Sequence, residues 1–303
     1  MTLEELKQWH RWTFDQKLDH AVATVENFFS RLDGRCFVSF SGGKDSTVLL
    51  DLVRRFVDKN CPAVFCNTGA EYPDVVNFVH SFDNVIVIKP KQTFKEIIEQ
   101  RGFPLVSKEQ SRYIRQARHT KSEKLRALRL NLDGEKRKFG FISKKWRYLV
   151  HERYDVSEEC CDILKKRPFK KFCKERNLRP LIATTCDESL LRAEMYVRRG
   201  GCSSFEKDKE ASYPLSIFLD SDIYEYIHKF DLRLCDLYKK GFVRTGCTAC
   251  GFGAHIDKER FKLLYRTCPR VAKKILCYEN HGTKYKDALV AAGCSLPHEL
   301  LEL

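Results

Sequence analysis

The chain has 303 residues, of which 43% are hydrophobic, so it can form one large domain or a domain with appendages. No apolar run is long enough to span a membrane, and residues 1–10 lack the apolar core of a signal peptide, which predicts a cytoplasmic protein with no membrane partner. Its 14 cysteines therefore favour free thiols or metal ligands over a disulfide framework.

Positive charge is concentrated in one stretch of the sequence. The net charge is +14, and residues 106–148 contain 14 Lys and Arg against four Asp and Glu. Such a segment favours a polyanionic partner, and we expect a nucleic acid, either tRNA or DNA. The alternative is a solvated helical face that keeps the protein soluble. The residues expected to contact the phosphate backbone are Arg112, Arg115 and Arg118 with their basic neighbours.

Helical and strand patterns alternate along the N-terminal part of the chain. Apolar residues recur with helical spacing between short apolar runs that are typical of buried strands. This alternation implies an α/β fold with a parallel sheet covered on both faces. We predict helices over residues 5–32, 47–57, 73–82 and 93–101, and strands over 35–40, 62–66, 85–88 and 180–184.

The stretch from Ser39 to Ser46 joins the first strand to the following helix. Two adjacent glycines let backbone N–H groups approach a ligand, and the start of a helix adds unpaired donors and a positive dipole end, which suits phosphate. Lys44 adds a positive charge. The alternative is an ordinary tight turn with a helix cap at Asp45 or Ser46. The spacing matches neither the nucleoside-triphosphatase loop nor the dinucleotide fingerprint.

Ligands of parallel sheets bind at the carboxyl ends of the strands. Thr68 and Gly69 follow the second strand, so we expect them beside the stretch from Ser39 to Ser46, called the phosphate loop from here on, although an ordinary loop is the alternative.

The later part of the chain contains further elements. They are a turn at 133–135 within a helix-prone segment, a helix from Cys160 to about Asn177 interrupted near Pro168, a helix capped by Asp187 that runs through Val197 to Gly200, and a helix capped by Ser221.

Two pairs of cysteines stand apart from the rest, Cys160-Cys161 and the Cys-x-x-Cys segment from Cys247 to Cys250. A Cys-x-x-Cys segment can be a redox pair, half of a zinc site or half of an iron–sulfur site. Glycines flank this one, which favours a turn whose backbone approaches a cluster. Structural zinc is the main alternative, but adjacent cysteines strain a tetrahedral site.

The hexapeptide Ser41-Gly42-Gly43-Lys44-Asp45-Ser46 resembles the PP-loop of the ATP pyrophosphatase and phosphoadenylyl-sulfate (PAPS) reductase superfamily. The resemblance covers most of residues 30–260. It implies an adenine nucleotide alpha hydrolase-like (HUP/Rossmann-like) core with helical additions, and ATP, APS or PAPS as ligand. The implied nucleotide-binding residues are Ser39, Ser41, Gly42, Gly43, Lys44, Asp45, Ser46, Thr68, Gly69, Glu188, Ser189 and Arg192.

A second resemblance concerns the cysteines. The segment from Cys160 to Pro168 is similar to the Cys-Cys-x-x-x-Lys-x-x-Pro segment of adenylyl-sulfate (APS) reductases. It implies that a [4Fe–4S] cluster is held by four thiolates, and that Lys165 lies near the negative charge of the cluster. The implied ligands are Cys160, Cys161, Cys247 and Cys250. Among the remaining cysteines, which we interpret as core or surface thiols, the strongest exceptions are Cys186 and Cys202.

The segment Glu188-Ser189-x-x-Arg192 is similar to the family segment that carries an arginine toward the substrate, and the alternative is a surface arginine.

The chain departs from the reductases at its end. Their C-terminal Glu-Cys-Gly-x-His motif is missing, and Cys294 follows a glycine that we expect to end a helix. Residues 102–110 and 244–247 resemble phage and mobile-element proteins of the same superfamily.

The leading hypothesis is an ATP pyrophosphatase that adenylates an oxygen on a nucleic acid, after which a sulfur species displaces AMP. In this reaction Lys44 and Arg192 would neutralise transition-state charge, and Mg²⁺ would bind through Asp45. A sulfur-donor or reductant protein would be a partner, and a homo-oligomer is left open.

The predicted regions are an N-terminal helix at 1–33, the nucleotide-binding core at 34–105 and 149–230, the basic insertion at 106–148 and a C-terminal segment at 231–303.

Two other functions stay open. One is the reductive cleavage of APS or PAPS to sulfite, in which Cys294 or a cysteine of a partner would attack the sulfur. The other is a regulatory module that binds a nucleotide without turnover. The intact PP-loop hexapeptide disfavours the second, because a binding module does not need every one of its residues.

Overall fold

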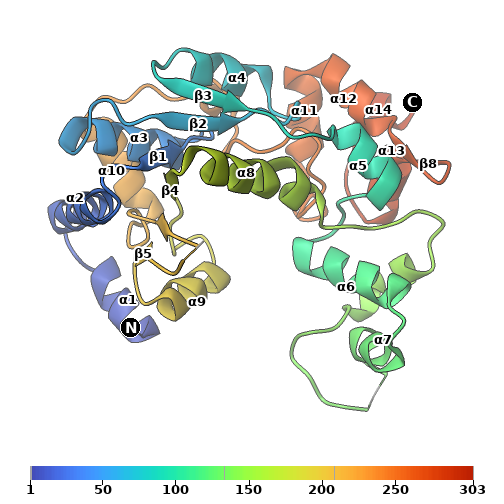
Figure 1. Ribbon diagram of the computed structural model, residues 1–303. Coiled ribbons are helices and arrows are strands. Elements are labelled where there is room, and N and C mark those ends of the chain that lie inside the picture. Colours follow the sequence, from blue (N-terminus) through green and yellow to red (C-terminus); the bar gives the residue numbers. More distant parts are fainter. Residues whose placement is uncertain (1, 133, 208, 303) are drawn as a thin grey trace. The chain divides into compact units, whose positions relative to one another are not determined.

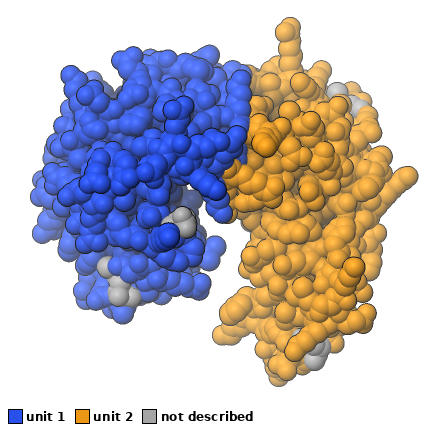
Figure 2. Space-filling view, in the orientation of Figure 1, with its two compact units in different colours: residues 1–67, 73–89, 168–245 blue, residues 68–72, 90–167, 246–303 orange. Residues whose placement is uncertain are grey.

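The computed structural model of the chain describes residues 2–132, 134–207 and 209–302. These described residues form two compact units, each assembled from separate segments of the chain (Figure 2). The predicted basic insertion at 106–148 belongs to the second unit, together with flanking residues that we expected in the core. The predicted turn at 133–135 includes Asp133, which lies outside the described residues. The first unit contains residues 1–67, 73–89 and 168–245, and the second contains 68–72, 90–167 and 246–303.

Among the described residues, six strands of the first unit form one sheet in the order β3-β2-β1-β4-β6-β5 (Figure 1). All neighbouring pairs are parallel except β5 with β6. The short β5 and β6 strands were not predicted, because two residues cannot show an alternation of apolar side chains. The strands are β1 (Cys36–Ser39), β2 (Ala63–Cys66), β3 (Val85–Ile88), β4 (Arg179–Leu181), β5 (Ser203–Ser204) and β6 (Ala211–Ser212).

The direction of strand succession reverses between β1 and β4. From β1 the chain adds β2 and β3 on one side, and it then returns to add β4 on the other. This doubly wound arrangement confirms the predicted parallel α/β fold of the HUP/Rossmann-like type, with helical additions. Ligands of such sheets bind at the carboxyl ends of the strands on either side of the reversal. The segments that follow β1 and β4 are therefore the expected ligand-binding part of the sheet.

Helices cover both faces of the sheet. Phe37 of β1 and Val64 of β2 pack against Phe172 of α8 (Arg167–Arg176), and the rings of Phe37 and Phe172 meet edge to face at 5.3 Å. The helix that follows β1, α3 (Lys44–Phe56), contacts β1. Because crossovers between parallel strands are right-handed, α3 and α8 lie on opposite faces.

The N-terminal region forms two helices rather than the single predicted one over residues 5–32. They are α1 (Leu3–His10) and α2 (Phe14–Arg31). Thr13 starts the second helix, because its side chain accepts the N–H of Gln16 while the Gln16 side chain accepts the N–H of Thr13. This reciprocal cap gives the chain a defined break.

A buried ion pair fixes the start of α10 (Asp220–Lys229). The Lys17 ammonium, only 1% exposed as a residue, lies 2.6 Å from the carboxylate of Asp222. The same carboxylate accepts the N–H of Leu219 at 2.6 Å. The predicted cap at Ser221 is therefore wrong, and Leu219 is the cap residue.

The other helices of the first unit are α4 (Pro73–His80), α9 (Leu190–Arg199) and the short 3-10 helix η3 (Tyr238–Lys240).

The second unit is mainly helical. Within the predicted basic insertion, α6 (Lys108–His119) packs against α7 (Glu123–Leu130) and the 3-10 helix η1 (Lys144–Val150). None of the described helices of the chain is long and apolar enough to cross a membrane. The remaining elements of the unit are α5 (Phe94–Arg101), the π-helical turn η2 (Asp162–Lys166), α11 (Arg260–Thr267), α12 (Pro269–Leu276), β7 (Glu279–Asn280), β8 (Thr283–Lys284), α13 (Tyr285–Ala291) and α14 (His298–Leu301).

Candidate nucleotide and thiol sites

The loop between β1 and α3 has no room for side chains at its two glycines. Gly42 has a φ of +71°, and an added Cβ would lie 2.9 Å from a methyl carbon of Val75. A Cβ on Gly43 would lie 2.7 Å from the hydroxyl of Thr245. Gly43 is also the N-cap of α3, so neither Asp45 nor Ser46 caps the helix. The two glycines therefore set the path of the loop at the point where the strand order reverses.

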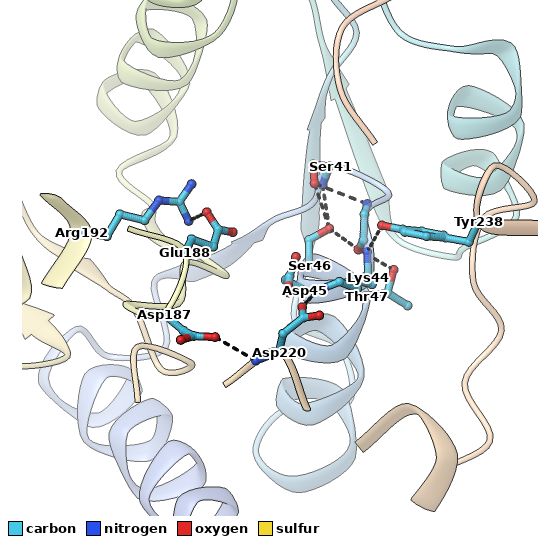
Figure 3. Close-up of polar contacts among 11 residues, drawn as sticks. Ser41, Lys44, Asp45, Ser46, Thr47, Asp187, Glu188, Arg192, Asp220 and Tyr238 are labelled. Atoms are coloured by element: carbon cyan, nitrogen blue, oxygen red, sulfur yellow. Dashed lines mark hydrogen bonds and ion pairs between the residues drawn. The ribbon is translucent and has the colours of Figure 1, made fainter. Parts of the chain in front are cut away.

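Hydroxyl groups converge inside this loop (Figure 3). The Ser41 N–H donates to Ser46 Oγ at 3.2 Å, and the two hydroxyl oxygens lie 3.0 Å apart. The Lys44 N–H donates to the hydroxyl of Tyr238 at 2.8 Å. These donors lie at the N-terminal end of a helix, and a phosphate group that bound here would replace the hydroxyl groups as their acceptor.

Lys44 is buried among carboxylates. Its ammonium lies 3.0 Å from Asp45 Oδ1 and also pairs with Asp220. Burial alone would lower the pKa of Lys44, but the hydrogen bonds and charges of Asp220 and Asp45 outweigh it, and the pKa is raised. Lys44 therefore keeps its positive charge at neutral pH, as a phosphate-binding lysine must.

Asp220 and Tyr238 are site residues that sequence reasoning missed. They lie 176 and 194 positions from Lys44, and no local pattern connects them to the loop. Asp187, which we predicted as the cap of α9, instead accepts the N–H of Asp220 at 3.4 Å. Ser189 caps α9, and the helix ends at Gly200 as predicted.

Arg192 lies on α9, in the segment that follows β4. Its guanidinium pairs with the carboxylate of Glu188, and its backbone N–H donates to the Ser189 hydroxyl at 3.4 Å. Figure 3 shows this pair beside the phosphate loop, without a contact drawn to it. A role of these three residues toward a nucleotide stays a prediction, since Arg192 would first have to leave Glu188.

Thr68 and Gly69 belong to the second unit, whereas the phosphate loop belongs to the first. The Thr68 N–H and hydroxyl both donate to the Glu71 carboxylate at 2.8 Å. Two of the donors of Thr68 are therefore already used within its own segment. Nucleotide contact by Thr68 and Gly69 stays a prediction.

The four predicted thiols line one cavity of the second unit. Cys160 starts the helical segment that continues into the π-helical turn η2, and such turns are frequent at functional sites. No group of three or more His, Cys, Asp or Glu among the described residues lies close enough to hold a single metal ion. A [4Fe–4S] cluster takes one thiolate on each of its irons, and its binding by these four cysteines stays a prediction. The cavity is lined by Phe94, Pro104, Cys160, Cys161, Leu164, Lys165, Cys247 and Cys250.

Lysines face these thiols. A hydrogen bond with Cys160, together with Lys108 and Lys165, lowers the pKa of Cys161 although burial opposes it, whereas the same hydrogen bond and burial raise the pKa of Cys160. Burial raises the pKa of Cys247 to about 11. Burial alone would lower the pKa of Lys165, but the charges of Cys247, Glu71 and Cys161 outweigh it, and the pKa is raised above its ordinary value.

Glu71 joins this charge network, and no sequence pattern had indicated it. Its carboxylate lies 3.5 Å from the Lys165 ammonium. Next to it, the carbonyl of Ala70 accepts both the N–H and the hydroxyl of Thr248, at 2.7 and 2.9 Å. Thr248 lies inside the Cys-x-x-Cys segment, so residues 68–72 hold the thiol loop in place.

The family model described as the phosphoadenosine phosphosulfate reductase domain matches residues 35–142 and 128–251. The chain belongs to this family. The two matched ranges include the phosphate loop, both cysteine pairs and Arg192. The predicted superfamily is thus confirmed, and a nucleotide-binding enzyme is the coarse function that follows.

Curated relatives of this reductase-family chain include two uncharacterized proteins of Methanocaldococcus jannaschii. They are 25% and 23% identical to it over 234 residues, which is 75% and 76% of this chain. The chain spans 44% and 39% of their lengths, less than half in each case.

Two solved structures are similar to this family member. The phosphoadenylyl-sulfate reductase of Candida auris, in a phosphate complex, has a TM-score of 0.42 and 14% identity, and the match covers 82% of this chain and 96% of that one. The FMN adenylyltransferase of Candida glabrata has a TM-score of 0.45 and 12% identity, with 81% and 68% covered.

Two of the three arginines expected to contact nucleic acid are engaged within the second unit. Arg115 donates to both oxygens of Glu158, at 3.0 and 2.6 Å. Arg118 donates to the carbonyl of Tyr154 at 2.6 Å. Arg112 is exposed. The first two therefore stabilise the fold of the insertion before they are available to a partner.

The glycines that flank the Cys-x-x-Cys segment differ in their surroundings. A Cβ on Gly251 would clash with the carbonyl oxygen of Pro104 and lie 2.6 Å from the Tyr285 hydroxyl, whereas nothing lies within 4 Å of a Cβ on Gly246. We expect Gly251→Ala to lower the free energy of unfolding by about 1–3 kcal/mol, as overpacked cores do. Chemical denaturation followed by circular dichroism measures it.

Gly246→Ala is the matched control, since it adds the same methyl group on the other side of the same segment. It should leave stability nearly unchanged. Equal losses in the two variants would mean that backbone flexibility, rather than the contact with Pro104 and Tyr285, explains the glycine at 251.

Proposed function

We propose that this chain is an ATP pyrophosphatase that adenylates an oxygen of a nucleic acid for sulfur transfer. The observation that carries the proposal is the phosphate loop. A protonated, buried Lys44, convergent hydroxyls and a helix start stand together at the reversal of the strand order. These groups suit the binding of a leaving pyrophosphate.

In the proposed reaction an oxygen of the nucleic acid attacks the α-phosphorus of ATP. A bond from that oxygen to phosphorus forms, the bond between the α-phosphorus and the bridging oxygen breaks, and pyrophosphate leaves with the electron pair. Lys44 and the loop N–H groups would bind the departing pyrophosphate. Arg192 would exchange Glu188 for a phosphate, for which its planar fork is suited. A sulfur nucleophile from a donor protein would then displace AMP.

Mg²⁺ would be held by carboxylates beside the loop. Asp45 was predicted for this role, and the structure adds Asp220, because both carboxylates pair with Lys44. Magnesium commonly binds through one or two carboxylates together with substrate phosphates. Asp45 and Asp220 would hold the metal, which would supply positive charge beside the phosphates, and Lys44 would then be available to the phosphates.

A [4Fe–4S] cluster would be held by the four thiolates of the second unit, and such a cluster supplies redox-active or sulfur-binding iron. The donors fit it, since the thiols line one cavity with apolar walls but are not grouped for a single ion. Lys108 and Lys165 would offset the negative charge of the thiolates.

The second unit also supports a polyanionic substrate. It contains 30 Lys and Arg against 18 Asp and Glu, a net charge of +12, whereas the first unit contains 25 against 23, a net charge of +2. Because Arg115 and Arg118 already bind groups of the same unit, we expect exposed lysines of the insertion to contact the phosphates of the nucleic acid. Among them are Lys121, Lys124 and Lys144.

The description of the family favours a second candidate, the reduction of APS or PAPS to sulfite. In this chain Cys294 is buried, and burial raises the pKa of its thiol to about 11. Gly293 before it has a φ of +77°, and Cys294 follows α13 closely. A reductase mechanism would therefore draw its nucleophile from a partner protein.

The ligand set is tested first. We expect anaerobically prepared protein to bind about four irons per chain with the broad visible absorption of a cubane cluster. Cys250→Ser should lose most of this iron, and Cys277→Ser, which changes an exposed cysteine outside the cavity, should keep it. Full iron retention in Cys250→Ser would contradict the assignment.

The reaction is tested by anaerobic assay of pyrophosphate release from ATP, with and without mixed tRNA or DNA. We expect release that depends on one of the two nucleic acids and falls at least about 100-fold in Lys44→Ala, because the charge on the leaving group loses its partner.

Three other outcomes separate the alternatives. Sulfite formed from APS or PAPS, without pyrophosphate from ATP, would select the reductase. Tight ATP binding with no turnover on any nucleic acid would select a regulatory module. Wild-type rates in Lys44→Ala would overturn the role of the phosphate loop.

Nucleic-acid binding should weaken steeply with salt, because phosphate contacts release counterions. We expect the triple variant Lys121→Gln, Lys124→Gln and Lys144→Gln to bind more weakly and to lower the slope of log K against log salt by about 0.9 per lost duplex contact. Fluorescence anisotropy at several salt concentrations measures both quantities.

The control removes the same charge from exposed lysines of the first unit, namely Lys59, Lys170 and Lys174. Binding by this control should stay near that of the wild type. Equal weakening in both triple variants would show that only the overall net charge matters and that the insertion is a solvated face.

A further inference from the structure

A second thiol site lies in the first unit. The sulfur of Cys202 is 3.5 Å from Nε2 of His20, within hydrogen-bonding distance for sulfur. His20 lies on α2, and Cys202 follows the two glycines that end α9. Cys202 is one of the two thiols that stood out in the sequence, and the proposed nucleotide chemistry does not use it.

A pocket of about 370 Å³ opens onto this pair. Its volume is that of a site for a small molecule. Both residues form part of its wall, so a ligand in the pocket would lie beside them. The residues that line it are Trp9, His20, Ala23, Thr24, Asn27, Gly200, Gly201, Cys202 and Ser203.

Aromatic rings orient the imidazole. Trp9 and Trp12 stack with their centroids 5.2 Å apart, and the His20 ring meets both of them edge to face, at 5.2 and 5.8 Å. The Thr24 hydroxyl donates to the carbonyl of His20 at 2.7 Å. Trp9 also lines the pocket, where its indole would suit the sulfur atoms of a ligand, since sulfur packs favourably on aromatic rings.

The pair is neutral at rest. Burial raises the pKa of the Cys202 thiol to about 11 and lowers the pKa of His20. In the tautomer with Nε2 unprotonated, the thiol can donate its hydrogen to the imidazole; the sulfur also lies 4.0 Å from the Tyr196 hydroxyl. His20 is then placed to take the proton as the sulfur attacks, which is how a neighbouring base activates a nucleophile.

The surroundings disfavour attack on a carbonyl group. The N–H groups of Gly200 and Gly201 already donate to carbonyls of α9, at 3.0 and 3.3 Å. Among the described residues that line the pocket, none carries a formal charge apart from a protonated His20. A developing oxyanion would therefore find neither a free N–H of these two glycines nor a permanent positive charge, and only neutral side chains such as Asn27 would remain to stabilise it. Exchange at a sulfur–sulfur bond needs a thiolate and a leaving thiol but no oxyanion site.

We propose that Cys202 and His20 form a thiol-exchange site for a small molecule that contains a sulfur–sulfur bond, either a persulfide or a disulfide. The Cys202 sulfur attacks one sulfur of the ligand, and its proton passes to Nε2 of His20. The sulfur–sulfur bond of the ligand breaks, and the leaving thiolate takes the proton from His20. A new sulfur–sulfur bond on Cys202 replaces the one that was broken, so no further oxidant or reductant is required.

The test is peptide mapping of the intact, cluster-loaded protein after brief anaerobic exposure to 2-hydroxyethyl disulfide or to the persulfide of 2-mercaptoethanol. The mass added to Cys202 distinguishes the sources, because the persulfide adds one sulfur atom and the disulfide adds a mercaptoethanol group. We expect Cys202 to react faster than the exposed Cys277, and His20→Gln to slow Cys202 about 100-fold, the effect of a lost general base.

Two cysteines of the chain serve as internal controls. Cys186 is buried like Cys202, and burial raises its pKa to about 11 as well, but its sulfur lies near the carbonyl of Arg192 rather than a histidine. It should stay unreactive, and its reaction in His20→Gln would reveal an unfolded variant. Cys277 should react equally in both proteins.

The comparison within the wild-type protein decides the question even if His20→Gln unfolds. A Cys202 that reacts as slowly as Cys186 would overturn the proposal and leave a buried structural thiol. A folded His20→Gln variant with unchanged Cys202 reactivity would remove His20 from the site.

Discussion

The nucleotide site depends on how one buried ammonium group is held. Lys44 stands at the first turn of α3, and its charge is balanced by Asp45 beside it and by Asp220 at the start of α10. Asp220 is placed in turn by the ion pair of Lys17 with Asp222, which fixes the first turn of that helix. A buried charge without such partners would be costly, so strand, loop and two helices are tied to one position.

The thiol site follows the same rule with opposite signs. Thiolates brought together in an apolar cavity repel one another, and lysines must be near for them to ionise. Lys108 comes from the start of α6 and Lys165 from the π-helical turn, while Glu71 faces Lys165. Elements that are far apart in the sequence therefore meet at the cysteines because their charges have to balance there.

Local patterns revealed the parts of both sites that are encoded locally. The phosphate loop, the first four strands and the two cysteine pairs could all be read from short stretches, since glycine conformation and apolar spacing act over a few residues. Asp220, Tyr238 and Glu71 could not be found this way, because their partners lie elsewhere in the chain. The break in the helix at Thr13 was missed because the apolar spacing continues across it and hides the cap. The ion pair of Arg115 with Glu158 was missed because it is a tertiary contact.

The uneven division of charge gives the molecule an electrical polarity. A polyanion in its surroundings acts mainly on the second unit and hardly on the nearly neutral first, so the molecule experiences a torque as well as an attraction. Rotation of this kind happens before contact and increases the fraction of encounters in which the basic surface arrives first. A small anion such as a free nucleotide carries few charges, and salt screens its field within about 10 Å, so it turns the molecule far less and its capture is governed by the local groups of its own pocket.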